Sequence, residues 1–279
     1  MKKLFLFGMF VCGTTSRLVA QDTTQHRLLG VRPVISIENV EFGKQALAGK
    51  VGVELQFKPT SKVNINFNLN GFLSQKTKAE SLGASPSAST ILAGYQDAYG
   101  NFNKIIPTSS TGGYPTPLIQ FKGATASLDA GIPFKLKDSS SATIEPFLGI
   151  EGKLFNRSTI FGEGSGYTFT EQYKFLSPTL GAKLNYTTKS KVKLTFRVSA
   201  AYPVIAKVKT DEKNLTAPNT EVDLTKQLSP SVEVGAKVKK MTIRFRYERV
   251  NIGQSDTLQR VSQPAPKVNI TGITIGYDF

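Results

Sequence analysis

Apolar and polar residues alternate with a period of two along most of this chain of 279 residues. In KVNINFNLNGFL (62–73), alternate positions hold Val, Ile, Phe and Leu, and the positions between them hold four Asn. KVKLTFRVSAAY (191–202) and MTIRFRYER (241–249) alternate in the same way. Period two is the side-chain period of a β-strand, so the chain is predicted to be all-β, with strands that have one apolar and one polar face.

Ten segments show this strand pattern. The first of them is the weakest, because Pro33 fits only at the end or edge of a strand. The alternation slips near Phe121 and near Gly272, where we expect either a β-bulge or the end of a strand. The predicted strands are 31–42, 48–58, 62–73, 116–136, 142–157, 171–187, 191–202, 228–239, 241–249 and 267–279.

The connections between these segments alternate strictly between short and long. The short ones are 58–62, 137–141, 188–191 and 239–240, and the long ones are 76–115, 158–170, 209–227 and 252–266. Short periplasmic turns and long extracellular loops are typical of a transmembrane β-barrel. With both termini in the periplasm the strand number is even, so we predict a closed antiparallel barrel of ten strands.

The alternation alone does not say which face points inward, since a soluble barrel places its apolar residues inside. The apolar faces here continue for five or more residues, and the last strand ends on an aromatic residue. In NITGITIGYDF, the residues Ile273, Ile275, Tyr277 and Phe279 share one face. These features favour a barrel with apolar residues outside, in contact with lipid.

The segment GITIGYDF resembles the carboxy-terminal β-signal of bacterial outer-membrane proteins, which ends on an aromatic residue preceded by alternating hydrophobic residues. Ile273, Ile275, Tyr277 and Phe279 match this signal position for position. The resemblance implies a small outer-membrane barrel of a Gram-negative bacterium, and the Ala-Gln pair at 20–21 is similar to cleavage sites of the Bacteroidetes group. It also implies recognition by the barrel-assembly machinery and closure of the last strand against the first.

The amino-terminal residues have the pattern of a cleaved secretory signal, with two Lys, an apolar run and a small residue at Ala20. We expect a signal at 1–20, a periplasmic segment at 21–30 and the barrel at 31–279. Cleavage removes Cys12, the only cysteine, and therefore any disulfide or thiol site. It also removes three basic residues, which takes the net charge from +15 to +12.

The inward faces carry charges of both signs with a basic excess, and ten strands enclose a lumen of modest size. The lumen is predicted to be largely closed by ion pairs, and a narrow pore that prefers anions is the alternative. The predicted lumen-lining residues are Lys50, Glu54, Asp129, Glu145, Glu151, Lys153, Lys183, Lys193, Arg197, Glu233, Lys237, Arg244, Arg246 and Glu248.

Further lysines at the short turns form a basic periplasmic rim, which is either solvated or in contact with anionic lipid heads or a protein partner. They are Lys58, Lys62, Lys137, Lys189, Lys191, Lys239 and Lys240. Aromatic residues near both ends of the strands are expected to form interfacial girdles, with Tyr173 among those near the long loops. Loop 76–115 either enters the lumen, presents a binding surface or is variable surface.

Catalytic and metal sites are not expected. The only histidine, His26, precedes the first strand, so a site at the outer rim lacks a histidine base or ligand. No nucleic-acid motif and no cofactor motif is present. We therefore expect a structural or binding barrel that acts through its loops in the outer membrane, with a narrow anion channel and a barrel anchor of an envelope secretion or assembly machine as alternatives. The expected partners are membrane lipid, the barrel-assembly machinery and a periplasmic or extracellular protein.

Overall fold

The computed structural model describes residues 27–42, 44–60, 62–78, 118–136, 141–161, 167–213, 221–252 and 267–279. Within these ranges all regular structure is β-strand. The strands are β1 (Arg27–Phe42), β2 (Lys44–Thr60), β3 (Val63–Ser74), β4 (Thr77–Lys78), β5 (Leu118–Gly131), β6 (Phe134–Lys135), β7 (Ala142–Phe161), β8 (Tyr167–Thr187), β9 (Lys193–Ala201), β10 (Ile205–Lys213), β11 (Glu221–Asp223), β12 (Ser229–Val238), β13 (Met241–Asn251) and β14 (Lys267–Tyr277).

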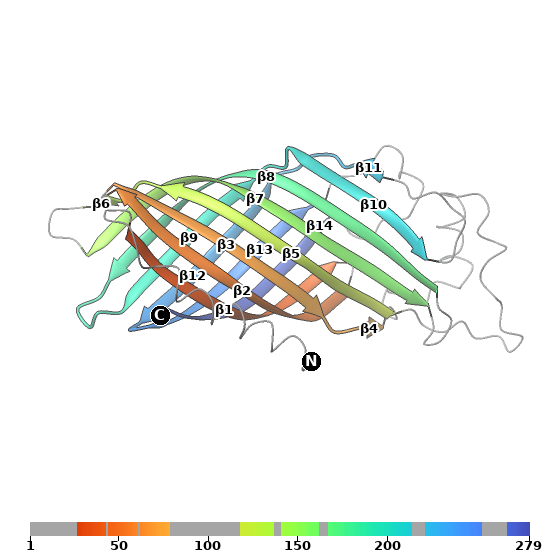
Figure 1. Cartoon of the computed structure of the whole chain (residues 1–279), viewed down its shortest axis with the longest axis horizontal. Helices are drawn as coiled ribbons and strands as arrows, with labels where there is room; N and C mark the ends of the chain where they lie inside the picture. The colour runs from red at the N-terminus through yellow and green to blue at the C-terminus, as the bar shows by residue number, and fades with distance from the viewer. Residues whose placement is uncertain are drawn as a thin grey trace, which may run out of the picture.

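Ten of these strands form a closed antiparallel barrel, as predicted. Around the barrel the order is β1, β2, β3, β5, β7, β8, β9, β12, β13 and β14. β14 pairs with β1, so the last strand closes the barrel against the first. The other four strands extend the barrel wall: β4 pairs with β5, β6 with β7, β10 with β8, and β11 with β10. Figure 1 shows the inclined strands, with β6 near one end and β4, β10 and β11 near the other.

The outer face of the barrel is apolar. Leu148 of β7 and Leu180 of β8 lie opposite each other and are 67% and 62% exposed. The side chains of Ile35, Ile37 and Ile273 on β1 and β14 are exposed in the same way. A water-soluble barrel would instead place such residues inside. A continuous apolar belt around a closed barrel is the surface that lipid requires, so the strands cross a membrane.

No helix within the described ranges is long and apolar enough to cross a membrane.

The strands differ from the predicted ones mainly at the end with the long connections. β7 and β8 continue to Phe161 and from Tyr167, so most of the predicted loop 158–170 belongs to the wall. β1 starts at Arg27 rather than at Val31, and only one residue separates β1 from β2. The predicted strict alternation of short and long connections is therefore wrong at this first hairpin.

The expected bulges near Phe121 and Gly272 are absent from the described pairings. Register is continuous through Phe121 in β5 and through Gly272 in β14. The pattern changes there because the inward face turns from polar to apolar while the strand keeps its phase. The register shifts that do occur lie between Leu28 and Gly30 and between Phe57 and Thr60.

A charge placed on the outer face tests the membrane assignment. We expect Leu148→Arg to lower the free energy of unfolding by about 2–4 kcal/mol if the residue lies near the bilayer midplane, because arginine replaces leucine in hydrocarbon. The measurement is denaturant unfolding of the barrel in lipid vesicles. Leu148→Ala is the control for lost apolar area. An arginine variant as stable as the alanine variant would contradict a lipid-facing position for this side chain.

Candidate functional site

The inward faces of the strands surround a cavity of about 820 Å³ in the barrel. Its lining extends to Lys58 and Lys135, beside the short turns, so the cavity belongs to that end of the barrel. All the predicted lumen residues except Lys153 line it. Lys153 borders a second, much smaller space of about 40 Å³, together with Lys50, Arg246 and Glu248.

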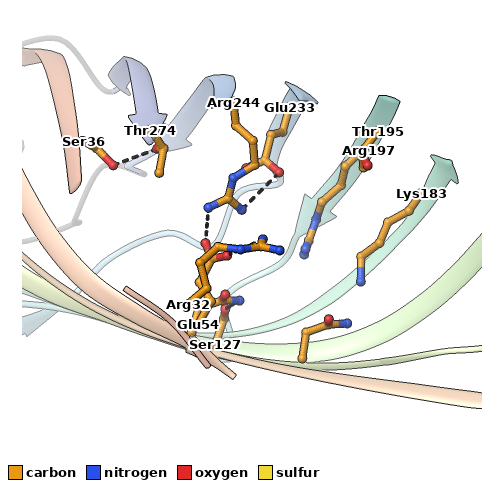
Figure 2. A network of polar contacts seen from close by, with 12 residues as sticks. Arg32, Ser36, Glu54, Ser127, Lys183, Thr195, Arg197, Glu233, Arg244 and Thr274 are labelled. Carbon is orange, nitrogen blue, oxygen red and sulfur yellow. Dashed lines mark hydrogen bonds and ion pairs between the residues drawn. The ribbon is translucent and has the colours of Figure 1, made fainter. Parts of the chain in front are cut away.

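A first group of ion pairs runs across the barrel near the short turns. Arg32 of β1 binds Glu54 at 3.2 Å and Asp278 at 2.5 Å. Arg244 of β13 contacts the same Glu54 and, at 3.6 Å, Glu233 of β12. Figure 2 shows Arg244 between Glu54 and Glu233. Asp278 also contacts Lys237. Strands far apart in the sequence are thus joined across the lumen.

A second group is centred on Asp129 of β5, whose side chain is 2% exposed. It binds Lys183 at 2.7 Å and Arg197 at 3.1 Å. Lys183 also reaches Glu145 at 3.2 Å. The ring of Phe147 lies under both cations, with its centroid 4.7 Å from the Lys183 nitrogen and 4.3 Å from the Arg197 guanidinium carbon. This geometry is a cation–π contact and fixes the two long side chains.

A glycine makes room for this ring. A Cβ atom at position 181 would lie 2.5 Å from the Cζ atom of Phe147 and closer still to the backbone oxygen of Val198. Gly181 lies directly opposite Phe147 in the pairing of β7 with β8. Any larger residue at position 181 would displace the ring of Phe147 from this place.

A third group lies deeper, toward the long connections. Lys153 contacts Glu248 and binds Glu151 at 3.0 Å. Arg246 binds Glu248 at 2.7 Å, which closes a small network. Beside it, Lys50 binds Glu38 at 2.8 Å, and both side chains are less than 10% exposed. Such pairs are costly to break singly, because one charge would then be buried without a partner.

The three groups are electrically balanced. Each cation in them has at least one carboxylate partner, and the eight cations are matched by eight carboxylates, so the formal charges of the three groups cancel. The cations are Arg32, Lys50, Lys153, Lys183, Arg197, Lys237, Arg244 and Arg246, and the anions are Glu38, Glu54, Asp129, Glu145, Glu151, Glu233, Glu248 and Asp278.

Arg32, Glu38 and Asp278 were missed in the sequence. The inward face of β1 also carries buried Val34 and Val40, which hides its polar character. Asp278 lies between Tyr277 and Phe279, which are on the outer face, so the alternation of the β-signal predicts that its side chain faces inward.

A layer of apolar side chains crosses the barrel interior beyond the third group. Phe121, Phe155 and Tyr173 are each at most 9% exposed, and the rings of Phe155 and Tyr173 stack at 4.8 Å between centroids. Phe72 and Ile270 pack against this layer. It contains Val40, Ala46, Ala48, Ile119, Phe121, Phe155, Tyr173, Phe175, Ala206, Val208, Leu224, Val250, Ile252 and Val268. Tyr173 is therefore an interior residue, and its predicted place in an interfacial girdle is wrong.

Beyond the apolar layer, Arg157 of β7 binds Glu171 of β8 at 3.1 Å. Glu171 is the first residue of the predicted strand 171–187 and lies within β8, which starts four residues earlier at Tyr167.

The β-signal residues lie on the outer face at the other end. Ile273 and Ile275 face Ile37 and Ile35 of β1, and the rings of Tyr277 and Phe279 meet edge to face at 5.6 Å. All four side chains are exposed.

The rim lysines divide into two sets. Lys58 lines the cavity, whereas Lys62, Lys189, Lys191, Lys239 and Lys240 are exposed and do not border it. Lys191 and Lys239 have φ angles of 63° and 53°, a left-handed conformation that usually favours glycine or asparagine. Lys137, His26 and loop 79–115 lie outside the described residues.

No group of three or more His, Cys, Asp or Glu side chains suited to a metal ion occurs in the part of the chain that the structure describes.

No protein-family model matches the sequence, and no curated protein matches it. Among solved structures, a major outer membrane protein of Thermus thermophilus is 13% identical with a TM-score of 0.42, over 89% of this chain and 99% of that one. The outer membrane protease OmpT of Escherichia coli is 10% identical with a TM-score of 0.41, over 92% and 99%. The translocator domain of the autotransporter NalP of Neisseria meningitidis is 10% identical with a TM-score of 0.40, over 100% and 97%.

The central carboxylate provides a test of the ion-paired interior. We expect Asp129→Asn to lower the free energy of unfolding by about 3–5 kcal/mol, because Lys183 and Arg197 lose their shared counter-ion in a buried position. Denaturant unfolding of the refolded barrel measures this. Glu221→Gln is the control, since Glu221 pairs with Lys207 on the exposed surface and its loss should not change stability measurably. Equal effects of the two substitutions would argue against a buried network.

Proposed function

We propose that this chain, a transmembrane β-barrel of the bacterial outer-membrane type, serves a structural or binding role with a lumen that does not conduct. The observation that carries the proposal is the apolar layer across the interior. Its members, apart from Leu224 and Ile252, come from β1, β2, β5, β7, β8, β10, β13 and β14, which lie all around the wall. Because they form one packed cluster, they fill the cross-section on the side of the long connections.

Entry into such a layer is unfavourable for water and ions, because its side chains are almost all apolar. Apolar constrictions in channels stop conduction by excluding water, even before side chains close the path completely. The space next to the layer, bordered by Phe72, Phe121 and Phe155, is about 40 Å³, against about 820 Å³ for the cavity on the other side of the charged network. An ion travelling along the barrel would meet both the balanced ion pairs and this layer.

The alternative of a narrow anion channel requires a path through the apolar layer. The cavity itself has the polar lining that a channel needs, including Asn66, Ser127 and Ser199. It ends, however, where the inward faces become apolar. We therefore favour the closed barrel, with binding through the segments at its ends and without catalysis. An anchor role in an envelope machine is compatible with the same barrel, but no described contact favours it.

Planar-bilayer recording of the refolded protein tests this function. We expect a silent wild-type barrel, with heat-modifiable gel migration as proof that it has folded. Phe121→Ala combined with Phe155→Ala should admit water into the apolar layer and produce openings. The control is Phe196→Ala combined with Phe245→Ala, which removes two phenylalanine rings from the outer face and should leave the barrel silent. Steady wild-type openings would overturn the proposal, whatever the variants do.

A further inference from the structure

Three lysines that line the large cavity stand outside its balanced ion pairs. They are Lys58 of β2, Lys135 of β6 and Lys193 of β9. Among the described residues none of the three has a carboxylate within ion-pair distance. All three lie at the end of the cavity beside the short turns. Among the described side chains, these three lysines thus add positive charge at this mouth to a set of ion pairs that is itself neutral.

The position of Lys193 makes this surplus more marked. Lys193 lies directly opposite Lys237 in the pairing of β9 with β12. Like charges directly opposite each other destabilise a sheet. Lys237 has one partner, Asp278, which it shares with Arg32. Lys237 and Arg32 therefore share the carboxylate of Asp278, and Lys193 beside them has no carboxylate partner among the described residues.

We propose that this end of the cavity is a binding site for a small organic anion with more than one phosphate or carboxylate group, which enters from the short-turn side. The inference rests on the closed lumen proposed above, because a sealed far end makes the cavity a chamber with one entrance. A volume of about 820 Å³ is within the usual range of small-molecule sites. Phosphate and carboxylate groups are the natural partners of unpaired lysines.

The rest of the chamber suits a ligand that is also rich in hydrogen-bonding groups. Hydroxyls and amides cover the wall between the charged groups. Several of them are paired with each other, such as Asn68 with Ser127 at 3.0 Å and Ser199 with Ser231 at 2.7 Å. A hydroxyl retains acceptor capacity after one such bond, so these pairs can also serve a ligand. An apolar ligand would find few partners on this wall.

Calorimetric titration of the full-length refolded barrel tests the site, with inorganic pyrophosphate as the probe and a maltoside detergent that carries no phosphate. We expect saturable binding in a buffer of fixed ionic strength. Replacement of Lys58, Lys135 and Lys193 together by Gln should weaken it by roughly a hundredfold, because three charged contacts with the anion are lost. Lys193→Gln alone should weaken it by roughly three- to tenfold.

These substitutions leave no carboxylate without a partner, so the barrel should still fold, and heat-modifiable migration verifies this. The matched control replaces Lys62, Lys189 and Lys240 by Gln, which removes the same charge from the exposed rim outside the cavity. It should change the affinity less than twofold.

The outcomes separate the two proposals. A silent barrel that does not bind pyrophosphate would overturn the anion site and leave the closed lumen intact. Equal weakening by the cavity variant and the rim variant would also overturn it, because binding would then reflect only the overall charge of that end. Steady openings with lysine-dependent binding would overturn the closed lumen, while the anion site would stand as part of a conducting path.

Discussion

The requirement that no backbone hydrogen-bonding group be left unpaired in lipid governs this fold. An open sheet edge in hydrocarbon leaves N–H and C=O groups without partners, each at a cost of several kcal/mol. The pairing of β14 with β1 removes that edge, and the pairing of β7 with β8 completes the ring. Closure in turn fixes which residues face inward. Since the side-chain period is two, the inward charges of the three ion-paired groups alternate along each strand with apolar residues on the outer face.

Inside the barrel, the charged side chains form separate groups at different depths along the barrel axis. The ion pair of Asp129 with Lys183 connects β5 with β8, and the contact of Arg244 with Glu54 connects β13 with β2, which is distant in the sequence. Buried pairs of this kind contribute little net stability but penalise any register that separates them. A slip of one residue would turn the charges toward lipid. The network therefore reinforces the register that the apolar belt already favours.

The fold was largely predictable from the sequence, and the interior only in part. The alternation fixes strand number and facing, because lipid outside and charges inside leave one phase per strand. The pattern was misread at Phe121 and Gly272, since an inward face that turns apolar looks like a change of phase. The ion-pair partner of each inward charge could not be predicted, because a contact such as that of Lys153 with Glu248 depends on the curvature and tilt of the closed barrel. The apolar layer could not be predicted either, because its members are one or two residues from each of eight strands, with Leu224 and Ile252 just beyond strand ends, and they meet only in the closed barrel.

The change of the two faces along the barrel also bears on how much of the wall lies in the membrane. At the end with the long connections Phe121, Phe175 and Val250 face inward, and by the period of two their neighbours Lys122, Lys174 and Arg249 lie on the outer face. Charged side chains on the outer face are unfavourable in hydrocarbon, so this part of the wall suits water or lipid headgroups better than the bilayer core. The apolar belt that lipid requires is therefore shorter than the strands, and the wall continues beyond it with apolar residues inside and polar residues outside.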